Sequence, residues 1–134
     1  MKIIDASVAL KWFVHEPSGQ AAADKILQEV ESDPRSFAVP DLFFAEMLHI
    51  LCRVFRDESK VKEALTLLET LGFERVGLGH ELMQLAAETS LKHKVTGYDA
   101  VYIATAKLLD GQWFTFDRQA HQKIIDLNLS TILN

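Results

Sequence analysis

Apolar and polar positions alternate along this chain with two different periods, which predicts strands and helices in turn. Five short segments read as strands, and four of them are bounded on at least one side by Pro, Gly or Asp. These segments are residues 2–4, 37–39, 75–76, 113–116 and 131–133. Between them lie longer stretches with apolar residues at helical spacing, namely 18–31, 40–56, 59–71, 81–93, 98–109 and 118–127. Strands separated by whole helices are typical of βαβ units, so the pattern predicts an α/β fold with a parallel sheet and right-handed crossovers covering both faces.

The size of the chain is consistent with one domain over residues 1–134, because 49% of its residues are apolar and can form a core. Cys52 is the only thiol, so one chain holds neither a disulfide framework nor a zinc site built from cysteines. The apolar runs near the N-terminus are broken by Asp5 and Lys11, and no run is long enough to cross a membrane. We therefore expect a cytoplasmic protein with no membrane partner.

The charge balance argues against a protein that binds nucleic acid through bulk electrostatics. Fourteen Lys and Arg residues face nineteen Asp and Glu residues, which gives a net charge of −5. A nucleic-acid partner would need local positive charge. Lys11 and Arg118, close in sequence to two of the acids described next, are candidate phosphate contacts, and ordinary solvated surface is an equal alternative for both.

Four carboxylates stand where an α/β sheet would bring side chains together. Asp5 follows the first predicted strand and Asp117 follows the fourth, while Asp99 lies near the start of a helix after residues 96–97. Glu46 lies about two turns into the helix after the second strand. In open parallel sheets, ligands bind beyond the carboxyl ends of the strands. We therefore expect the four acids to meet at one end of the sheet.

Each acid also has a simpler explanation. Asp5 and Asp117 are suited to N-caps, and Asp99 is placed to complete a capping box. Glu46 is too deep in its helix to cap it, and its neighbours at helical spacing are largely apolar. A buried carboxylate without a partner is unfavourable, so Glu46 either pairs with a cation such as Arg53 or faces a polar site.

Convergence of the four acids would create a strong demand for a cation. With oxygens about 5 Å apart and an effective dielectric of about 20, each charged pair repels by roughly 3 kcal/mol. Either some acids are protonated or a divalent cation neutralises them, and an all-oxygen set suits Mg²⁺ or Mn²⁺ better than zinc. Such an ion polarises a phosphoryl oxygen and activates water, so phosphodiester hydrolysis is the natural chemistry.

The segments that carry these acids resemble the successive motifs of PIN domains. They are residues 3–7 (IIDAS), the helix with Glu46 after residues 39–41 (VPD), residues 98–104 (YDAVYIA) and residues 114–117 (FTFD). Their order, and the spacing of 18 between the last two acids, resemble the VapC-like toxins of type II toxin–antitoxin pairs. The resemblance covers essentially the whole chain, including residues 9–13 (ALKWF), a sequence often seen in those toxins after the first acid.

This resemblance implies a three-layer PIN-like fold, with a central parallel sheet of about five strands flanked by helices. It also implies a Mg²⁺- or Mn²⁺-dependent endoribonuclease that cuts RNA and arrests growth once it is free of its antitoxin. The implied partners are therefore a cognate antitoxin protein, an RNA substrate and a second copy of the chain in a homodimer. The alternative is a non-catalytic interaction module that keeps the PIN fold, although such a module has no reason to retain four mutually repelling acids.

Carried over position by position, the resemblance assigns a role to each motif residue. The four acids would be the catalytic and metal-binding residues: Asp5, Glu46, Asp99 and Asp117. Asp5 and Asp99 would be the first candidates for direct ligands. The hydroxyls of Ser7 and Thr115 would orient a carboxylate or a bound water. Helix capping is the alternative for Ser7, and strand propensity is the alternative for Thr115.

His49 departs from the commoner pattern, because related toxins often carry Asn three residues after the second acid. It shares a helix face with Glu46, so its imidazole either packs beside the site or forms a hydrogen bond to it. The aromatic residues fall in apolar periodic segments, so we expect them mostly in the core and not as a base-stacking platform. They are Trp12, Phe43, Phe44, Tyr98, Tyr102 and Trp113.

Other catalytic motifs are incomplete. Residues 80–84 begin like a zinc-binding protease helix, but Gln84 stands where the second His is required. Residues 77–79 begin like a dinucleotide-binding loop, yet Leu82 replaces the third glycine.

Overall fold

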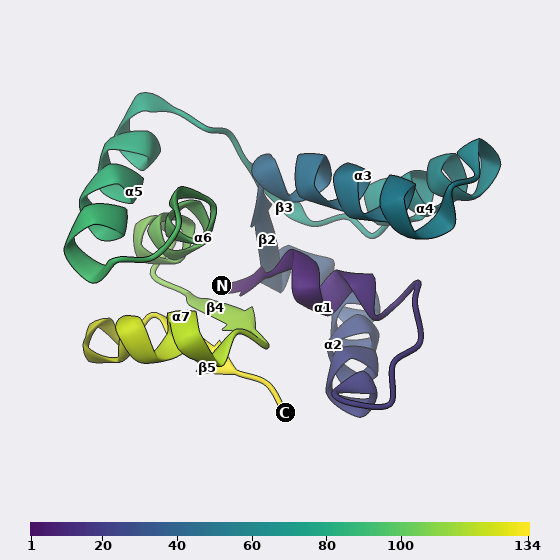
Figure 1. Ribbon diagram of the computed structural model, residues 1–134, viewed down its shortest axis with the longest axis horizontal. Helices are drawn as coiled ribbons and strands as arrows, with labels where there is room; N and C mark the ends of the chain where they lie inside the picture. The colour runs from purple at the N-terminus through teal and green to yellow at the C-terminus, as the bar shows by residue number, and fades with distance from the viewer.

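A five-stranded, entirely parallel sheet forms the centre of the computed structural model, which describes residues 1–134 (Figure 1). The strands are β1 (Lys2–Ile4), β2 (Phe37–Pro40), β3 (Glu74–Val76), β4 (Gln112–Thr115) and β5 (Ser130–Ile132). Their order in the sheet is β3-β2-β1-β4-β5. The predicted α/β fold with a parallel central sheet is confirmed.

Helices cover both faces of this sheet. Those that connect β1, β2 and β3 are α1 (Ala6–Leu10), α2 (Gln20–Ser32), α3 (Leu42–Phe55) and α4 (Glu58–Thr70), with a 3₁₀ turn, η1 (Pro34–Ser36). Those that follow β3 are α5 (His80–His93), α6 (Gly97–Leu108) and α7 (Arg118–Lys123), with a second 3₁₀ turn, η2 (Ile125–Leu127). The purple to blue helices lie on one side of the strands in Figure 1, and the green to yellow helices lie on the other. The arrangement has three layers, as right-handed crossovers require.

The connection order makes β1 the point at which the winding reverses. β1 pairs with β2 on one side and with β4 on the other, so the chain first winds in one direction and later returns to wind in the opposite direction. In doubly wound sheets, the connections that leave such a point diverge and open a crevice beyond the carboxyl ends of the strands. The residues that follow β1 and β4 therefore lie at the mouth of this crevice.

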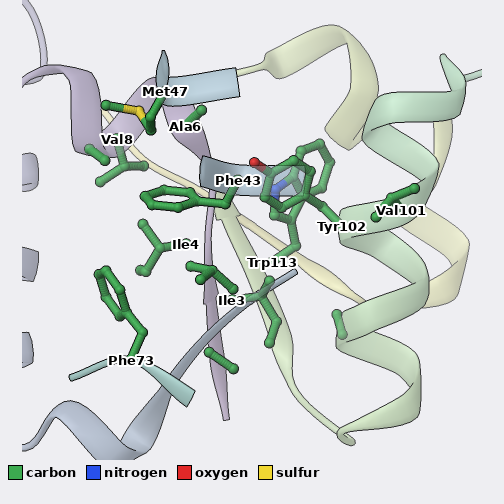
Figure 2. Packing of buried hydrophobic residues seen from close by; sticks show 14 of the residues in the cluster. Ile3, Ile4, Ala6, Val8, Phe43, Met47, Phe73, Val101, Tyr102 and Trp113 are labelled. Carbon is green, nitrogen blue, oxygen red and sulfur yellow. The ribbon is translucent and has the colours of Figure 1, made fainter. Parts of the chain in front are cut away.

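The core packs against both faces of β1. Successive side chains of a strand point to opposite faces, so Ile3 and Ile4, which are both fully buried, contact different layers. Figure 2 shows Ile4 on the side of Phe43, and the rings of Tyr102 and Trp113 on the other side, next to α6. The last two rings are stacked, with centroids 6.1 Å apart and planes at 21°.

Three details differ from the sequence predictions. The short helix α1 was not expected, because five residues span too few turns to show a period. The helix expected over residues 118–127 ends at Lys123, where the fully buried Ile124 leaves helical geometry, and η2 follows. Helix α3, expected to be apolar almost all round, buries one stripe of Phe43, Met47 and Leu51, while Leu48 and Val54 are exposed. The other element bounds agree with the predictions to within two residues.

None of the helices combines the length and the apolar composition that a membrane span needs.

Candidate active site

The four predicted acids come from four elements that end or begin near the crevice. Asp5 directly follows β1, and Asp117 lies two residues after β4. Asp99 is in the first turn of α6, and Glu46 is in α3. The acids interact electrostatically: burial and, to a smaller extent, the charges of Asp5, Asp117 and Glu46 together raise the pKa of Asp99 to about 6. The structure therefore brings the four carboxylates into one acidic field.

Asp5 is the most buried of the four acids and the best held. Its Oδ2 accepts hydrogen bonds from the backbone N and the hydroxyl of Ser7 and from Thr115 Oγ1, which is 3.3 Å away. Its Oδ1 accepts a hydrogen bond of 3.3 Å from Trp113 Nε1. Burial raises the pKa of Asp5, and these hydrogen bonds offset only part of that effect. The carboxylate is thus fixed in place, but its protonation is favoured unless a positive charge lies nearby.

The two predicted hydroxyl residues both contact Asp5. Besides its bond to Asp5, the Thr115 hydroxyl accepts a hydrogen bond of 3.0 Å from the backbone N of Asp117. One side chain on β4 thereby links the carboxylate after β1 to the chain segment that presents Asp117. Trp113 lies two residues earlier on the same face of β4, which is why its indole also reaches Asp5.

Sequence reasoning missed the contribution of Trp113 to the site, since an apolar strand gives no sign of a polar contact across the sheet. The only available signal was its spacing of two from Thr115, combined with the β1–β4 pairing of Ile3 with Trp113. That register follows from tertiary structure and cannot be derived from the local sequence.

The capping role is confirmed for Asp5 and Asp117 but not for Asp99, and it does not exclude a role in the site. Asp5 caps α1, and Asp117 caps α7 by accepting a hydrogen bond of 3.0 Å from the backbone N of Ala120. At α6 the cap is Thr96, whose hydroxyl accepts from the backbone N of Asp99. Capping therefore orients Asp5 and Asp117 at the carboxyl end of the sheet and leaves the carboxylate of Asp99 free from the role of cap.

Glu46 and Tyr102 form an unsatisfied pair under the acidic field. Glu46 Oε1 and the Tyr102 hydroxyl are both buried, and neither has a hydrogen-bond partner. Burial has the largest effect on the pKa of Glu46 and raises it. The Tyr102 hydroxyl lies near enough to lower this pKa, although the two groups miss hydrogen-bond geometry, and the charge of Asp5 raises it. The alternative in which a cation such as Arg53 pairs with Glu46 is wrong, because no cation forms an ion pair with this acid. Glu46 is therefore the acid that faces a polar site.

A divalent cation fits this set of side chains. In the positions seen here, no three His, Cys, Asp or Glu side chains converge closely enough to hold one ion directly. Mg²⁺ usually takes only one or two direct carboxylates and keeps several waters, so a looser group of acids suffices. The orphaned oxygens of Glu46 and Tyr102 supply polar partners for such water, and no Lys or Arg forms an ion pair with any of the four acids.

Two other predictions need correction. Lys11 is neither a free phosphate contact nor solvated, because its Nζ bonds Glu16 and the carbonyl of Ser18 and lies 4.9 Å from the centre of the Phe116 ring.

Tyr98 was expected in the core, but 66% of it is exposed. Among the other aromatic residues, the core prediction is confirmed for three fully buried rings and two partly buried ones: Phe43, Tyr102, Trp113, Trp12 and Phe44. Arg118 is exposed and donates a hydrogen bond to Asn134.

Tyr102→Phe tests the unsatisfied pair. A buried hydroxyl without a partner is unfavourable, so its removal should leave the chelator-treated protein as stable as the parent or more stable by up to about 1 kcal/mol. The same change should reduce the rise in melting temperature caused by millimolar Mn²⁺, because bound ion and water lose a polar partner. Thermal melts in chelator and in Mn²⁺ provide both readouts.

Thr105→Val is the matched control for Tyr102→Phe, because the Thr105 hydroxyl is buried on the same helix and donates 2.7 Å to the carbonyl of Val101. It should lose about 1 kcal/mol of stability and keep its response to Mn²⁺. Equal losses of stability in the two variants would show that the Tyr102 hydroxyl already has a partner.

Comparison with known proteins gives one family and a consistent set of relatives. The sequence model of the PIN domain matches residues 2–125. Ribonuclease VapC3 from Pyrobaculum aerophilum is 27% identical over 121 residues, which cover 90% of this chain and 92% of that protein. A toxin–antitoxin complex from Klebsiella pneumoniae contains a chain with a TM-score of 0.70 and 16% identity, covering 98% of this chain and 96% of that one. VapC20 from Mycobacterium tuberculosis, a toxin that cleaves the sarcin–ricin loop, has a TM-score of 0.72 and 15% identity, covering 91% of this chain and 94% of that one. At these identities the two solved structures establish a shared fold.

Proposed function

The chain belongs to the PIN domain family, and from that premise we propose that it is a divalent-metal-dependent endoribonuclease, the toxin of a toxin–antitoxin pair. The observation that supports this most directly is the shared acidic field, in which burial, followed by the charges of three other acids, raises the pKa of Asp99 to about 6. Such a field is unfavourable in the absence of a cation, which is typical of a functional site and not of a structural one. The ribonuclease named among the relatives aligns over nearly the whole chain, which supports the same chemistry.

In this proposal, Asp5 and Asp99 hold the ion, and Glu46 and Asp117 complete the acidic set. A bound Mg²⁺ or Mn²⁺ would polarise the scissile phosphate and lower the pKa of water. The protein contributes orientation: Ser7, Thr115 and Trp113 fix both oxygens of Asp5. Glu46, whose pKa is raised by burial, is suited to accept a proton from water.

The proposal also covers the domain organisation of the chain and its protein partners. Residues 1–134 would act as one PIN-like domain in the cytoplasm, paired with a second copy and inhibited by a cognate antitoxin protein. The toxin–antitoxin complex among the structural relatives supports the antitoxin partner. The exposed apolar residues of α3, Leu48 and Val54, are consistent with a surface that another protein covers.

The function is tested with protein purified free of any antitoxin. We expect cleavage of RNA in Mg²⁺ or Mn²⁺, complete loss of cleavage in chelator and recovery when the ion is restored, measured as labelled fragments on a denaturing gel. Protein carrying Asp5→Asn, purified in parallel, controls for contaminating nucleases. No cleavage of any RNA with either ion, together with no divalent binding in a calorimetric titration, would leave the non-catalytic interaction module as the function.

A further inference from the structure

We propose that the hollow beside Glu46 is a nucleobase subsite, in which one base of the RNA next to the cleaved phosphate stacks on Tyr98 and is contacted by His49. The inference rests on the proposed ribonuclease function and adds how the enzyme selects its cleavage site. The hollow has a volume of about 330 Å³ and is bounded by α3 and the start of α6. It is lined by Leu42, Ala45, Glu46, His49, Ile50 and Tyr98.

The hollow shares one residue, Glu46, with the acidic site. Glu46 lines it and also interacts with the charges of Asp5 and Asp99. Tyr98 is the residue directly before Asp99, so the wall of the hollow and a candidate metal ligand belong to the same helical turn. A nucleotide whose phosphate reaches the acids would therefore place a neighbouring base at this wall.

Tyr98 has the features of a stacking surface. The residue is 66% exposed, and its ring takes part in none of the aromatic ring pairs of the core. An exposed ring on the first turn of α6 contributes little to folding, yet it is held by a rigid element. Proteins that recognise single-stranded RNA stack unpaired bases on such aromatic side chains.

His49 and Arg53 supply the polar contacts that a nucleotide requires. His49 is exposed one turn after Glu46 and forms no hydrogen bond within the protein. A neutral imidazole offers one donor and one acceptor, which suits the edge of a base. Arg53 lies a further turn along α3, is exposed and forms no ion pair. It provides local positive charge for the next phosphate, which a protein with a net charge of −5 needs.

The size of the hollow favours a base over a protein segment. Pockets for small molecules usually occupy about 300–1,000 Å³, so this hollow fits a single flat ring system. A protein partner would need a surface of about 800 Å² on each side, which extends far beyond six residues. Four of the six lining residues are apolar, and Glu46 and His49 add polar groups, a composition typical of small-molecule pockets.

The test compares cleavage of an RNA pool with a randomised central segment, with fragment ends sequenced. Parent protein should show a base preference at one position next to the cut. Tyr98→Ala should flatten that preference and lower kcat/KM by about 10- to 100-fold, mainly through KM, while Tyr98→Phe should retain both. His49→Asn should change which base is preferred. Leu91→Ala, at an apolar residue of α5 that is 84% exposed, is the control and should cut like the parent.

A second readout avoids catalysis. In chelator, a short fluorescently labelled RNA that carries the preferred sequence should bind the parent and Tyr98→Phe proteins with equal affinity, and Tyr98→Ala about tenfold more weakly, as measured by anisotropy. Light scattering on the same samples should show one oligomeric state for all variants.

Three results would overturn the subsite. If the parent cuts RNA and Tyr98→Ala cuts it at the same positions with the same kcat/KM, the subsite is wrong while the ribonuclease function stands. If Tyr98→Ala changes the oligomeric state, the hollow is a contact between copies of the chain. If the parent cuts no RNA, both the subsite and the proposed function fall.

Discussion

Asp99→Asn should abolish RNA cleavage and, at the same time, make the chelator-treated protein more stable. The activity should fall by more than about 100-fold, because Asp99 is a proposed direct ligand and such a ligand contributes several kcal/mol to stabilising charge in the transition state. The opposite effect on stability follows from the acidic field, since burial and then the charges of Asp5, Asp117 and Glu46 disfavour ionised Asp99. An amide of the same shape carries no charge and escapes that penalty.

The stability gain depends on pH in a direction that can be derived. Asp99 has a pKa of about 6 in the folded protein against 3.8 as the reference, so the folded state binds its proton more tightly than the unfolded state. The stability of the parent therefore falls as pH rises from about 4 through about 6, and then levels off. Asp99→Asn should thus gain nothing near pH 4 and about 1–2 kcal/mol at pH 8, once solvent screening of this partly exposed group is allowed for.

Melting curves in chelator across this pH range, combined with the cleavage assay in Mn²⁺, measure both effects. Asp126→Asn is the control, because Asp126 is exposed in η2 and lies outside the acidic set. It should change neither cleavage nor the pH profile. An Asp99→Asn protein that is less stable than the parent at pH 8 in chelator would contradict the acidic field.

The four acids could be located from the sequence because their positions follow from connectivity. Asp5 and Asp117 follow predicted strands, and parallel strands end on the same side of a sheet, so local patterns were enough to place them together. Glu46 could be recognised because its charge conflicts with the apolar residues around it, and a carboxylate on an apolar helix needs a partner. The structure shows that this partner is neither Arg53 nor any other cation.

The residues that sequence reasoning misplaced depend on tertiary contacts. Tyr98 belongs to an apolar periodic segment, but it lies in the first turn of α6, where it is exposed. Lys11 is next to apolar residues in sequence, yet the loop after α1 brings Glu16 and Phe116 around its ammonium group. A hydrophobic period identifies a helix and its apolar face, but it does not say where along that helix the covering layer ends.

Trp113→Ala should cause the largest loss of stability, and Trp113→Phe should separate its two roles. Trp113 is fully buried on β4, stacked on Tyr102 and paired in register with Ile3 on β1. Removing the whole ring should lower the free energy of unfolding by about 3–5 kcal/mol, measured by chemical denaturation. Phe keeps a ring but removes the 3.3 Å hydrogen bond from Nε1 to Asp5, so it should lose about 1–3 kcal/mol and remain folded.

Trp12→Phe is the matched control for the role of that hydrogen bond. Trp12 is also stacked on an aromatic ring, that of Phe73, and its Nε1 donates 2.9 Å to the carbonyl of Ala23, outside the acidic set. Both Phe variants lose one indole hydrogen bond, but only Trp113→Phe frees an oxygen of the proposed metal ligand. The rise in melting temperature caused by Mn²⁺ and the rate of RNA cleavage should therefore fall in Trp113→Phe and stay unchanged in Trp12→Phe. Equal responses of the two variants to Mn²⁺ would mean that the ion does not depend on how Asp5 is held, and that Trp113 serves the core alone.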